Sequence, residues 1–448
     1  MPSYIDAVKV IYSVMKKVLV ITYYWPPSGG AGVQRALKFV KYLPEFNVQP
    51  IVLTVDETRG SYPVLDDSLV NDIPKDVKVF KTNSFEPLKI LSKVASKKAI
   101  PYGGFSGQNK EKFSQRILRF IRGNFFIPDA RVGWVKFAYH EACRIIEEEQ
   151  IDTIMISSPP HSSQLIGLKL KKKYPTIKWV ADLRDPWTDI YYYKEMMHTR
   201  MAKGKDARYE RDVLNQADAI LMVSNDIKRS FIAKSSNQNE SKFHVIPNGF
   251  DEDDFGGVVA DELGKFIVTY VGTIADVYKP QIFFEAMRNL IDKNQGDKII
   301  IRFVGSISPA ISNVVDRLGL IDHCEFISHV SHDEAIKYMM HSTLLLLVIP
   351  EVENNKGILT GKLFEYLNTR KPIIGLGPED GDAAAIINEC NAGKMFDRTN
   401  KMKLETYIES LYQSWKNKAL SLNKSTAVDQ FSRKEQARFL SEIIHKSK

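Results

Sequence analysis

The segment Val18-Leu-Val-Ile-Thr-Tyr-Tyr24 runs directly into Trp25-Pro-Pro-Ser-Gly-Gly-Ala-Gly32. The first part has the length and apolar character of a buried strand, and the second is a glycine- and proline-rich turn. In the following residues, 31–43, apolar side chains recur at the helical spacing i, i+3, i+4 and i+7: Val33, Ala36, Leu37 and Val40. A strand, a tight turn and an amphipathic helix in this order predict the beginning of a parallel α/β sheet.

The same alternation continues through both halves of the chain. In the first half we expect strands at 50–55, 77–80, 153–157, 178–183, 219–223 and 243–246, and helices at 135–149 and 162–173. A polar, glycine-containing stretch at 251–262 is typical of an interdomain linker. Beyond it we expect strands at 266–271, 299–304, 325–327, 344–349 and 372–375, and a final helix at 432–445. The pattern predicts two doubly wound domains, which bind ligands at the carboxyl ends of their strands.

The composition excludes several classes of protein. With 448 residues, 44% of them apolar, the chain can build two or three packed cores and is not globally disordered. No apolar run approaches the roughly 20 residues of a membrane span. Three scattered cysteines argue against a disulfide framework and favour the cytoplasm as the location. We expect residues 1–14 to form a loose extension, with Met15 as an alternative start.

Positive charge is concentrated in the first half. Residues 1–250 carry 38 Lys and Arg against 26 Asp and Glu, a balance of +12, whereas residues 251–448 have a balance of −4. This asymmetry suggests an anionic partner for the first half, which would be nucleic acid, a membrane surface or a phosphorylated substrate. An accidental surface composition explains a net charge of only +8 equally well.

The glycine turn at 25–32 could hold an anion, because the N-terminus of the next helix presents free N–H groups and the positive end of its dipole. Gly30-Ala-Gly32 also supplies the first two glycines of a dinucleotide fingerprint, and Asp56 ends the second strand. However, Arg35 stands at the third glycine position. A dinucleotide site is therefore the weaker hypothesis, and a tight turn without a ligand is a further alternative.

Two more groups of polar residues follow expected strands of the first half. Ser157-Ser-Pro-Pro-His161 would project His161 from a strand end, unless this side chain only caps the next helix. Asp182-Leu-Arg-Asp-Pro-Trp187 places Arg184 and Asp185 after the next strand. These two charged side chains could bind substrate hydroxyls, or they could form a local ion pair that fixes the loop.

The second half offers cations and a helix N-terminus. Tyr270-Val-Gly-Thr273 ends its first strand, and Lys279 begins the next helix as a candidate for neutralising a phosphate. Residues 357–365 form a more specific group. Its candidate contacts to a nucleotide are the backbone N–H groups at Thr360 and Gly361, the Lys362 ammonium and the Glu365 carboxylate. The alternative is an ordinary capped helix with a solvated glutamate.

Metal and hydrolase sites are weakly supported. His329, His332 and His341 are close in sequence but lack the carboxylate of a zinc motif, and Ser331-His-Asp-Glu334 is instead a capping box that predicts a helix start. The acidic Asp251-Glu-Asp253 lies in the expected linker. Neither a G-x-S-x-G elbow nor a P-loop is present. We therefore expect no metal site.

Six motifs, in order, resemble those of the family-4 glycosyltransferases of the GT-B fold, and together they span nearly the whole chain. They are Pro-Pro-Ser-Gly-Gly (26–30), Ser-Ser-Pro-Pro-His (157–161), Asp-Leu-Arg-Asp-Pro-Trp (182–187), Val-Ile-Pro-Asn-Gly-Phe-Asp (245–251), Tyr-Val-Gly-Thr (270–273) and Gly-Lys-Leu-Phe-Glu-Tyr-Leu (361–367).

The resemblance implies an α/β architecture of two facing Rossmann-like domains. Residues 15–250 would form the acceptor domain, 264–428 the nucleotide-sugar domain, and 429–448 a helix that returns to the first domain. It also implies a retaining, metal-independent transferase without a cofactor, whose donor is a nucleotide-diphosphate sugar. The acceptor would be a glycan or a lipid-linked molecule, and the pathway that of a bacterial-type cell-surface polysaccharide, either lipopolysaccharide or capsule.

The same resemblance implies roles for individual residues. His161, Lys279 and Glu365 would be catalytic, contacting the transferred sugar, the pyrophosphate and the ribose respectively. The nucleotide-sugar contacts would be Gly29, Gly30, Gly272, Thr273, Lys279, Thr360, Gly361, Lys362 and Glu365. Arg184 and Asp185 are candidates for contact with the acceptor or the sugar.

Two residues depart from the family pattern. Gly357 replaces the first glutamate of the family's paired-glutamate motif, and Thr273 stands where an arginine often follows the strand-end glycine. These departures leave the identity of the donor open. They also keep an alternative function open, that of a non-catalytic nucleotide-sugar-binding subunit.

The densest basic stretch lies at 86–126. Between Glu86 and Arg122 it has nine Lys and Arg and only two acids, interleaved toward its end with Ile, Leu and Phe. Such a mixture can lie on an anionic membrane surface. We hypothesise that it docks the first domain on the inner face of the cytoplasmic membrane, near a lipid-linked acceptor. A core-facing helix with solvated cations is the alternative; nucleic acid is a less favoured partner because no binding module is recognised.

Overall fold

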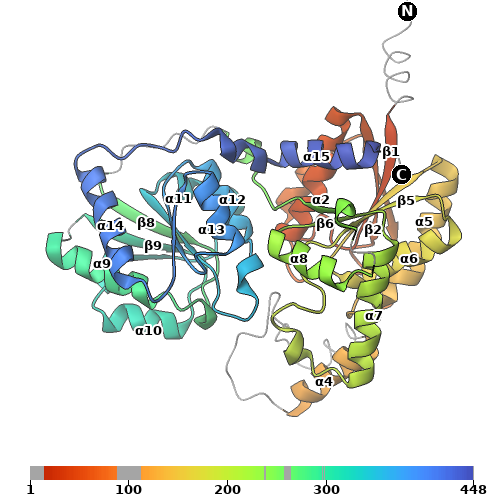
Figure 1. Cartoon of the computed structure of the whole chain (residues 1–448), viewed down its shortest axis with the longest axis horizontal. Helices are drawn as coiled ribbons and strands as arrows, with labels where there is room; N and C mark the ends of the chain where they lie inside the picture. Colours follow the sequence, from red (N-terminus) through yellow and green to blue (C-terminus); the bar gives the residue numbers. More distant parts are fainter. Residues whose placement is uncertain are drawn as a thin grey trace, which may run out of the picture. The chain divides into compact units, whose positions relative to one another are not determined.

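A computed structural model describes residues 15–87, 113–236, 239–256, 264–294, 296 and 298–446. The chain forms two compact units: unit 1 runs to Pro247 and resumes at Arg433, and unit 2 is Asn248–Ser432. Each unit is built on one parallel sheet with helices on both faces (Figure 1). The extension expected at 1–14 lies outside the described residues.

The sheet of unit 1 has seven strands in the order β3-β2-β1-β4-β5-β6-β7. Their bounds are β1 Lys16–Thr22, β2 Val48–Val55, β3 Lys78–Thr82, β4 Thr153–Ser157, β5 Lys178–Asp182, β6 Ala219–Met222 and β7 Phe243–Val245. All pairs are parallel. The continuous apolar run Val18–Ile21 is fully buried, as expected for a central strand covered on both faces.

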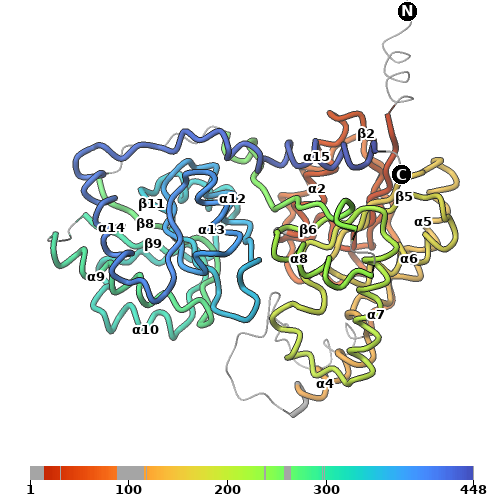
Figure 2. The backbone as a smooth tube through the Cα atoms, in the orientation of Figure 1, coloured from red at the N-terminus to blue at the C-terminus, as the bar shows by residue number. Residues whose placement is uncertain are grey.

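Helices cover both faces of this sheet. One face packs against α5 (Val135–Glu149), α6 (Gln164–Lys173), α7 (Arg200–Gln216) and α8 (Asn225–Lys234). The other packs against α2 (Ala31–Tyr42) and α15 (Arg433–His445). Figure 2 shows the blue C-terminal helix α15 beside α2. Lys178 Nζ stabilises the C-terminal end of α15 by donating to the carbonyls of Ile443 and Lys446.

The sheet of unit 2 has six strands in the order β10-β9-β8-β11-β12-β13. Their bounds are β8 Phe266–Val271, β9 Ile299–Val304, β10 Cys324–Ile327, β11 Leu344–Val348, β12 Ile373–Leu376 and β13 Gly393–Phe396. One face packs against α9 (Gln281–Asn294), α10 (Pro309–Arg317) and α14 (Lys401–Lys416). The other packs against α11 (His332–Met340), α12 (Gly361–Asn368) and α13 (Asp382–Glu389).

The two sheets share one topology. In each, the first strand in sequence lies between the second and the fourth, which places a topological switch point between β1 and β4 in unit 1 and between β8 and β11 in unit 2. Ligands of such sheets bind at the carboxyl ends of the strands on either side of this point. The predicted fold class, two doubly wound α/β domains with a returning C-terminal helix, is confirmed.

The structure differs from the sequence prediction in detail. The sequence did not predict strand β13. The polar stretch at 251–262, expected to be a linker, also begins after the division between the units, which lies between Pro247 and Asn248. Phe250 is already buried in the core of unit 2, and Glu252–Phe255 forms a 3₁₀ turn there. The buried aromatic ring explains this, because it anchors the chain to unit 2 before the polar residues begin.

Candidate functional site

Three strand-end loops of unit 1 meet at the carboxyl edge of its sheet. Arg184, which follows β5, donates from Nε to the carbonyl of Ser158 at 2.7 Å and from Nη2 to that of Pro159 at 3.1 Å. A Cβ added to Gly32 would lie 2.3 Å from Arg184 Nη1. Arg184 therefore ties the loop after β5 to the loop after β4 and to the glycine turn after β1.

Arg184 and Asp185, both proposed from sequence as acceptor contacts, have different surroundings. The Arg184 side chain is buried and donates to loop carbonyls, so it fixes the site rather than facing solvent. Asp185 is exposed. Of the two, Asp185 is the more open to a ligand, although burial of its carboxyl raises its pKa and the charge of Arg184 opposes that shift.

The two glycines of the first turn also differ. The Gly29 N–H donates to the carbonyl of Val64 at 2.9 Å, and the residue is buried against Asp66. Gly30 is exposed, has φ +100° and precedes α2; a Cβ there would meet no atom within 4 Å. The open space and the left-handed backbone make Gly30 the better ligand contact.

His161 begins the turn that follows β4, and its ring stacks on Trp187 with centroids 4.7 Å apart and 9° between the planes. Burial, followed by the charge of Arg184, lowers the pKa of His161 to about 3. The imidazole is therefore neutral near pH 7. Its Nδ1 is buried and has no hydrogen-bond partner in the part of the chain that the structure describes.

In unit 2, Gly272 directly follows β8 and has φ +104°, and a Cβ there would lie 3.1 Å from Lys362 Nζ. Lys362 Nζ donates to the Tyr270 hydroxyl at 2.8 Å, and that hydroxyl donates to the carbonyl of Thr273 at 2.9 Å. Burial lowers the pKa of Lys362 to about 7, although the Glu365 carboxylate opposes the shift. Lys362 is thus held at the strand end of β8, with its ammonium protonated below about pH 7 and neutral above it.

The N-terminus of α12 carries an unsatisfied polar group. Thr360 is the N-cap residue, yet its side chain makes no capping hydrogen bond. Its Oγ1 is buried and lacks a partner among the described residues. Gly361, the first helical residue, adds one of the N–H groups that every helix start leaves open. An anion with several oxygens would satisfy these donors together.

Lys279 lies in the loop after β8 and its ammonium pairs with Glu351, which follows β11, at 2.7 Å. Both side chains are exposed. Arg398 stabilises this loop by donating to the carbonyls of Lys279 at 3.4 Å and Tyr278 at 2.8 Å. Thr273, in the same loop, is exposed. The proposed phosphate-binding cation is thus at the expected edge, but a carboxylate already accompanies it.

Glu365, the expected ribose contact, has an unexpected partner. Its Oε1 lies 3.1 Å from Nε2 of His332, at the start of α11. Burial disfavours the charged imidazolium, but the hydrogen bond and charge of Glu365 outweigh this and raise the pKa of His332 to about 9. Ser331 caps α11 as predicted, accepting from the Glu334 N–H at 3.3 Å. Among the described residues, no group of three His, Cys, Asp or Glu could hold a metal.

Sequence reasoning missed several residues of these edges. They are Arg35, Trp187, Tyr270, His332 and Arg398. Each acts through a partner far away in the sequence, so no local spacing reveals that contact. Local signals existed: Arg35 stands where a dinucleotide-binding turn would need a glycine, Trp187 and Tyr270 lie in the motifs at 182–187 and 270–273, and His332 lies in the capping box.

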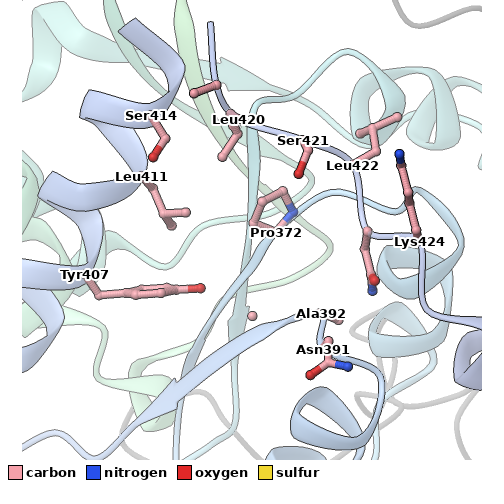
Figure 3. Close-up of a pocket in the computed structure, with 13 residues that line it drawn as sticks. Pro372, Asn391, Ala392, Tyr407, Leu411, Ser414, Leu420, Ser421, Leu422 and Lys424 are labelled. Atoms are coloured by element: carbon pink, nitrogen blue, oxygen red, sulfur yellow. The ribbon is translucent and has the colours of Figure 1, made fainter. Parts of the chain in front are cut away.

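A separate cavity of about 590 Å³ lies at the opposite end of the unit 2 sheet (Figure 3). Pro372, just before β12, and Gly393, at the start of β13, line it together with Tyr407 on α14. These are the amino ends of the strands. The cavity is therefore distinct from the edge that carries Thr360 and Lys362.

Comparisons with known proteins agree with this geometry. Residues 102–254 match the model of Glycosyltransferase Family 4. A glycosyltransferase from Rickettsia africae ESF-5 superposes with a TM-score of 0.60 at 16% identity, covering 97% of this chain and 100% of that one. HepE from Anabaena in complex with UDP superposes with a TM-score of 0.57 at 15% identity, and the match covers 96% of this chain and 99% of HepE. WaaG, a glycosyltransferase involved in lipopolysaccharide biosynthesis, superposes with a TM-score of 0.53 at 13% identity, and the match covers 96% of this chain and 100% of WaaG.

No curated protein sequence matches the chain significantly. The structural similarities, at such low identity, establish the fold. The family match covers a third of the chain and falls mainly on unit 1, the unit that holds the Ser157–His161 and Asp182–Trp187 motifs. Over residues 102–254 the match with the Glycosyltransferase Family 4 model supports the resemblance inferred from the motifs, and the fold of the chain is that of the GT-B glycosyltransferases.

Proposed function

We propose that this chain is a glycosyltransferase that moves a sugar from a nucleotide-diphosphate donor to a glycan or lipid-linked acceptor, with retention and without a metal. The observation that carries the proposal is the start of α12. There the orphaned Thr360 hydroxyl, the Lys362 ammonium and the Glu365 carboxylate follow one another along one helix end. Thr360 and Glu365 are separated by about 7.5 Å of helix rise. That spacing suits a diphosphate at the N-terminus and ribose hydroxyls one turn further on.

The chemistry of this edge suits departure of a nucleoside diphosphate. Negative charge grows on the leaving phosphate as the sugar becomes oxocarbenium-like, and preorganised donors lower the barrier by stabilising it. Lys362, Lys279 and the open N–H groups of α12 are such donors. They supply the positive potential that a divalent cation would otherwise supply. The neutral His161 imidazole, with its unpartnered Nδ1, is suited to a hydroxyl of the transferred sugar.

Similar proteins suggest the substrate class. HepE has been solved with UDP and with UDP-glucose, and WaaG takes part in lipopolysaccharide biosynthesis. We propose a nucleotide sugar as the donor and a bacterial-type surface polysaccharide, lipopolysaccharide or capsule, as the product. Retention of the anomeric configuration is proposed from the family resemblance.

A non-catalytic nucleotide-sugar-binding subunit is the second candidate. It is favoured by Gly357, which has no carboxylate, and by the ion pair that engages Lys279 with Glu351. The missing carboxylate at Gly357 weakens binding of the sugar hydroxyls, and the ion pair of Lys279 weakens binding of the pyrophosphate. Neither affects Lys362 or Glu365, so nucleotide binding is expected in both cases.

We also propose that unit 1 docks on an anionic membrane surface. On α4 (Phe113–Phe125), Ile117, Phe120 and Phe125 are exposed, next to the exposed Arg116. Arg119 and Arg122 on the same helix are half-buried, and the six lysines of the stretch, Lys89, Lys93, Lys97, Lys98, Lys110 and Lys112, lie outside the described residues. No described helix is long and apolar enough to cross a membrane. Surface docking through such a helix needs no membrane span.

A screen of nucleotide sugars tests the proposal. The purified chain is incubated with UDP-, GDP-, ADP- and CMP-linked sugars, with and without membrane lipid extract and with and without EDTA. Release of nucleotide and labelled product are measured, and the anomeric configuration of the product is read by proton NMR. We expect turnover of one donor class, insensitive to EDTA, with a retained anomer. Binding of a nucleotide sugar without any release would favour the non-catalytic subunit.

A further inference from the structure

The side chain of His332 lies against the carboxylate proposed to bind ribose, although the two residues are 33 positions apart. Its Nε2 is 3.1 Å from Glu365 Oε1. The two side chains are about one quarter and one fifth exposed, so the pair is partly open to a ligand. No hydrogen bond to the second oxygen, Oε2, is found among the described residues. One carboxylate oxygen is therefore held and the other is available.

The charges around His332 favour its cationic form. Glu365 on α12, Asp254 on the 3₁₀ turn Glu252–Phe255 and Asp333 on α11 all favour the protonated ring. Their combined effect overcomes burial, and the pKa of His332 is raised to about 9. Near pH 7 the contact to Glu365 is thus a charge-assisted hydrogen bond. Such bonds are shorter and stronger than neutral ones.

We propose that His332 is a positioning residue for the donor nucleotide, which fixes the Glu365 carboxylate so that its other oxygen accepts the ribose hydroxyls. The inference rests on the proposed function, because it assigns Glu365 to ribose. A glutamate has three side-chain torsions to restrict, and ordering it at the moment of binding costs affinity. His332 makes that restriction part of the folded protein.

The test compares a ribonucleotide with its 2′-deoxy counterpart. The tightest binder among UDP, GDP, ADP and CDP is identified by calorimetry and then measured beside the 2′-deoxy form. Wild-type protein should prefer the ribose form by about tenfold, the value of one hydrogen bond to a charged group. His332→Ala should reduce that preference to within about twofold, whereas His332→Gln, whose amide can still donate to Glu365, should retain most of it.

A double-mutant cycle shows whether His332 acts through Glu365. Glu365→Gln should remove the ribose preference, and adding His332→Ala should change it no further, because coupled residues are not additive. His329→Gln is the matched control: His329 precedes α11 and is exposed. Its ribose preference should equal that of the wild type. Melting curves show that each variant is folded.

The outcomes separate this inference from the function on which it rests. If the wild type binds no nucleoside diphosphate, the proposed function fails and the role of His332 fails with it. If the wild type prefers ribose and His332→Ala keeps that preference, only the role of His332 is overturned. The same holds if the effects of His332→Ala and Glu365→Gln simply add.

Discussion

The guanidinium of Arg35 donates to both carboxylate oxygens of Asp182 at 3.0 to 3.1 Å, and neither side chain is exposed to solvent. Its Nη1 donates to the carbonyls of Ile246 at 2.9 Å and Pro247 at 2.8 Å, and the Ser157 hydroxyl donates to Asp182 at 3.0 Å. A buried charge pair is tolerated only when its polar atoms are satisfied in this way. Arg35 thereby joins α2, the end of β5 and the last residues before the chain leaves unit 1.

Asp182→Asn should destabilise unit 1 strongly. It leaves the Arg35 charge buried without a counter-ion, and breaking such a pair typically costs about 3–5 kcal/mol in the free energy of unfolding. Urea unfolding followed by tryptophan fluorescence measures the change. The signal reports mainly on unit 1, which contains four of the five tryptophans: Trp25, Trp134, Trp179 and Trp187.

The control for this variant is Asp226→Asn. Asp226 pairs with Arg229 at 2.9 Å, but that arginine is two-thirds exposed. Losing an exposed pair changes stability by less than about 1 kcal/mol. Equal unfolding curves for the two variants would contradict the structural role of Arg35.

Donor binding should weaken as the pH rises through about 7. Because burial lowers the pKa of Lys362 to about 7, the side chain is a cation below that pH and neutral above it. A bound diphosphate favours the cation, so the Kd of a nucleotide sugar should rise above pH 7, approaching about tenfold per pH unit. A sugar-linked donor is used because its phosphates do not titrate in this range.

Lys362→Arg separates this effect from general pH sensitivity. Arginine stays charged throughout the range, so the Kd of this variant should be flat from pH 6 to about 9. For Lys362→Gln the Kd should also be independent of pH, but binding should be weak throughout the range. A wild-type Kd that does not change with pH would remove Lys362 from the phosphate site.

Lys279→Ala and Glu365→Ala should each abolish most transfer while leaving the fold intact. Both remove a charged contact to the donor, and losing one such electrostatic group costs about 10²–10³ in kcat. Turnover is measured with the donor found in the screen. Lys401→Ala serves as the control, because Lys401 is exposed on α14 and pairs with Glu285 at 2.6 Å. Near-wild-type turnover of both site variants would overturn the site assignment.

The fold was predictable because its signals are local. The apolar run at 18–24, the glycine turn and the helical spacing at 31–43 lie in one continuous segment, and each confirmed strand has a similar signature. β13 was missed because Gly393-Lys-Met-Phe396 is short and has only two apolar residues. It becomes a strand through pairing with β12, which is a tertiary effect.

The candidate site was predictable only in part, for a related reason. His161, which follows β4, and Glu365, within α12, are marked by their position in a motif. What surrounds them is set by side chains from other elements: Trp187 against His161, and His332 against Glu365. The burial that makes His161 neutral is likewise a property of the packed structure. No periodicity in the sequence encodes such contacts.

If unit 1 docks on a membrane, the exposed apolar side chains of α4 should be needed for binding to anionic liposomes. Replacing Ile117, Phe120 and Phe125 together with serine should abolish co-flotation with anionic liposomes, because the apolar contact is lost while the basic residues remain. Binding of the wild type should fall at high salt and on neutral liposomes. Met201→Ser, at an 87% exposed position on α7, is the control. Flotation that is unaffected by the triple substitution would exclude this face.

Gly32→Ala should impair catalysis by displacing Arg184. The new Cβ would lie 2.3 Å from Nη1, so the guanidinium must move from the carbonyls of Ser158 and Pro159. Those carbonyls belong to the loop that ends in His161, whose stack on Trp187 then loosens. Overpacking of this kind costs about 1–3 kcal/mol of stability. We expect kcat to fall more than donor affinity, since Lys362 and Glu365 are in the other unit.

Gly204→Ala is the matched control for this substitution. Gly204 lies within α7, and an added Cβ there meets no atom within 4 Å. Alanine is favoured over glycine inside a helix by about 0.5–1 kcal/mol, so this variant should be slightly more stable than the wild type and equally active. If Gly32→Ala behaves in the same way, Arg184 does not hold the loop of His161. If only Gly32→Ala loses kcat with unchanged donor Kd, the loss arises in unit 1, where the sugar contact is proposed.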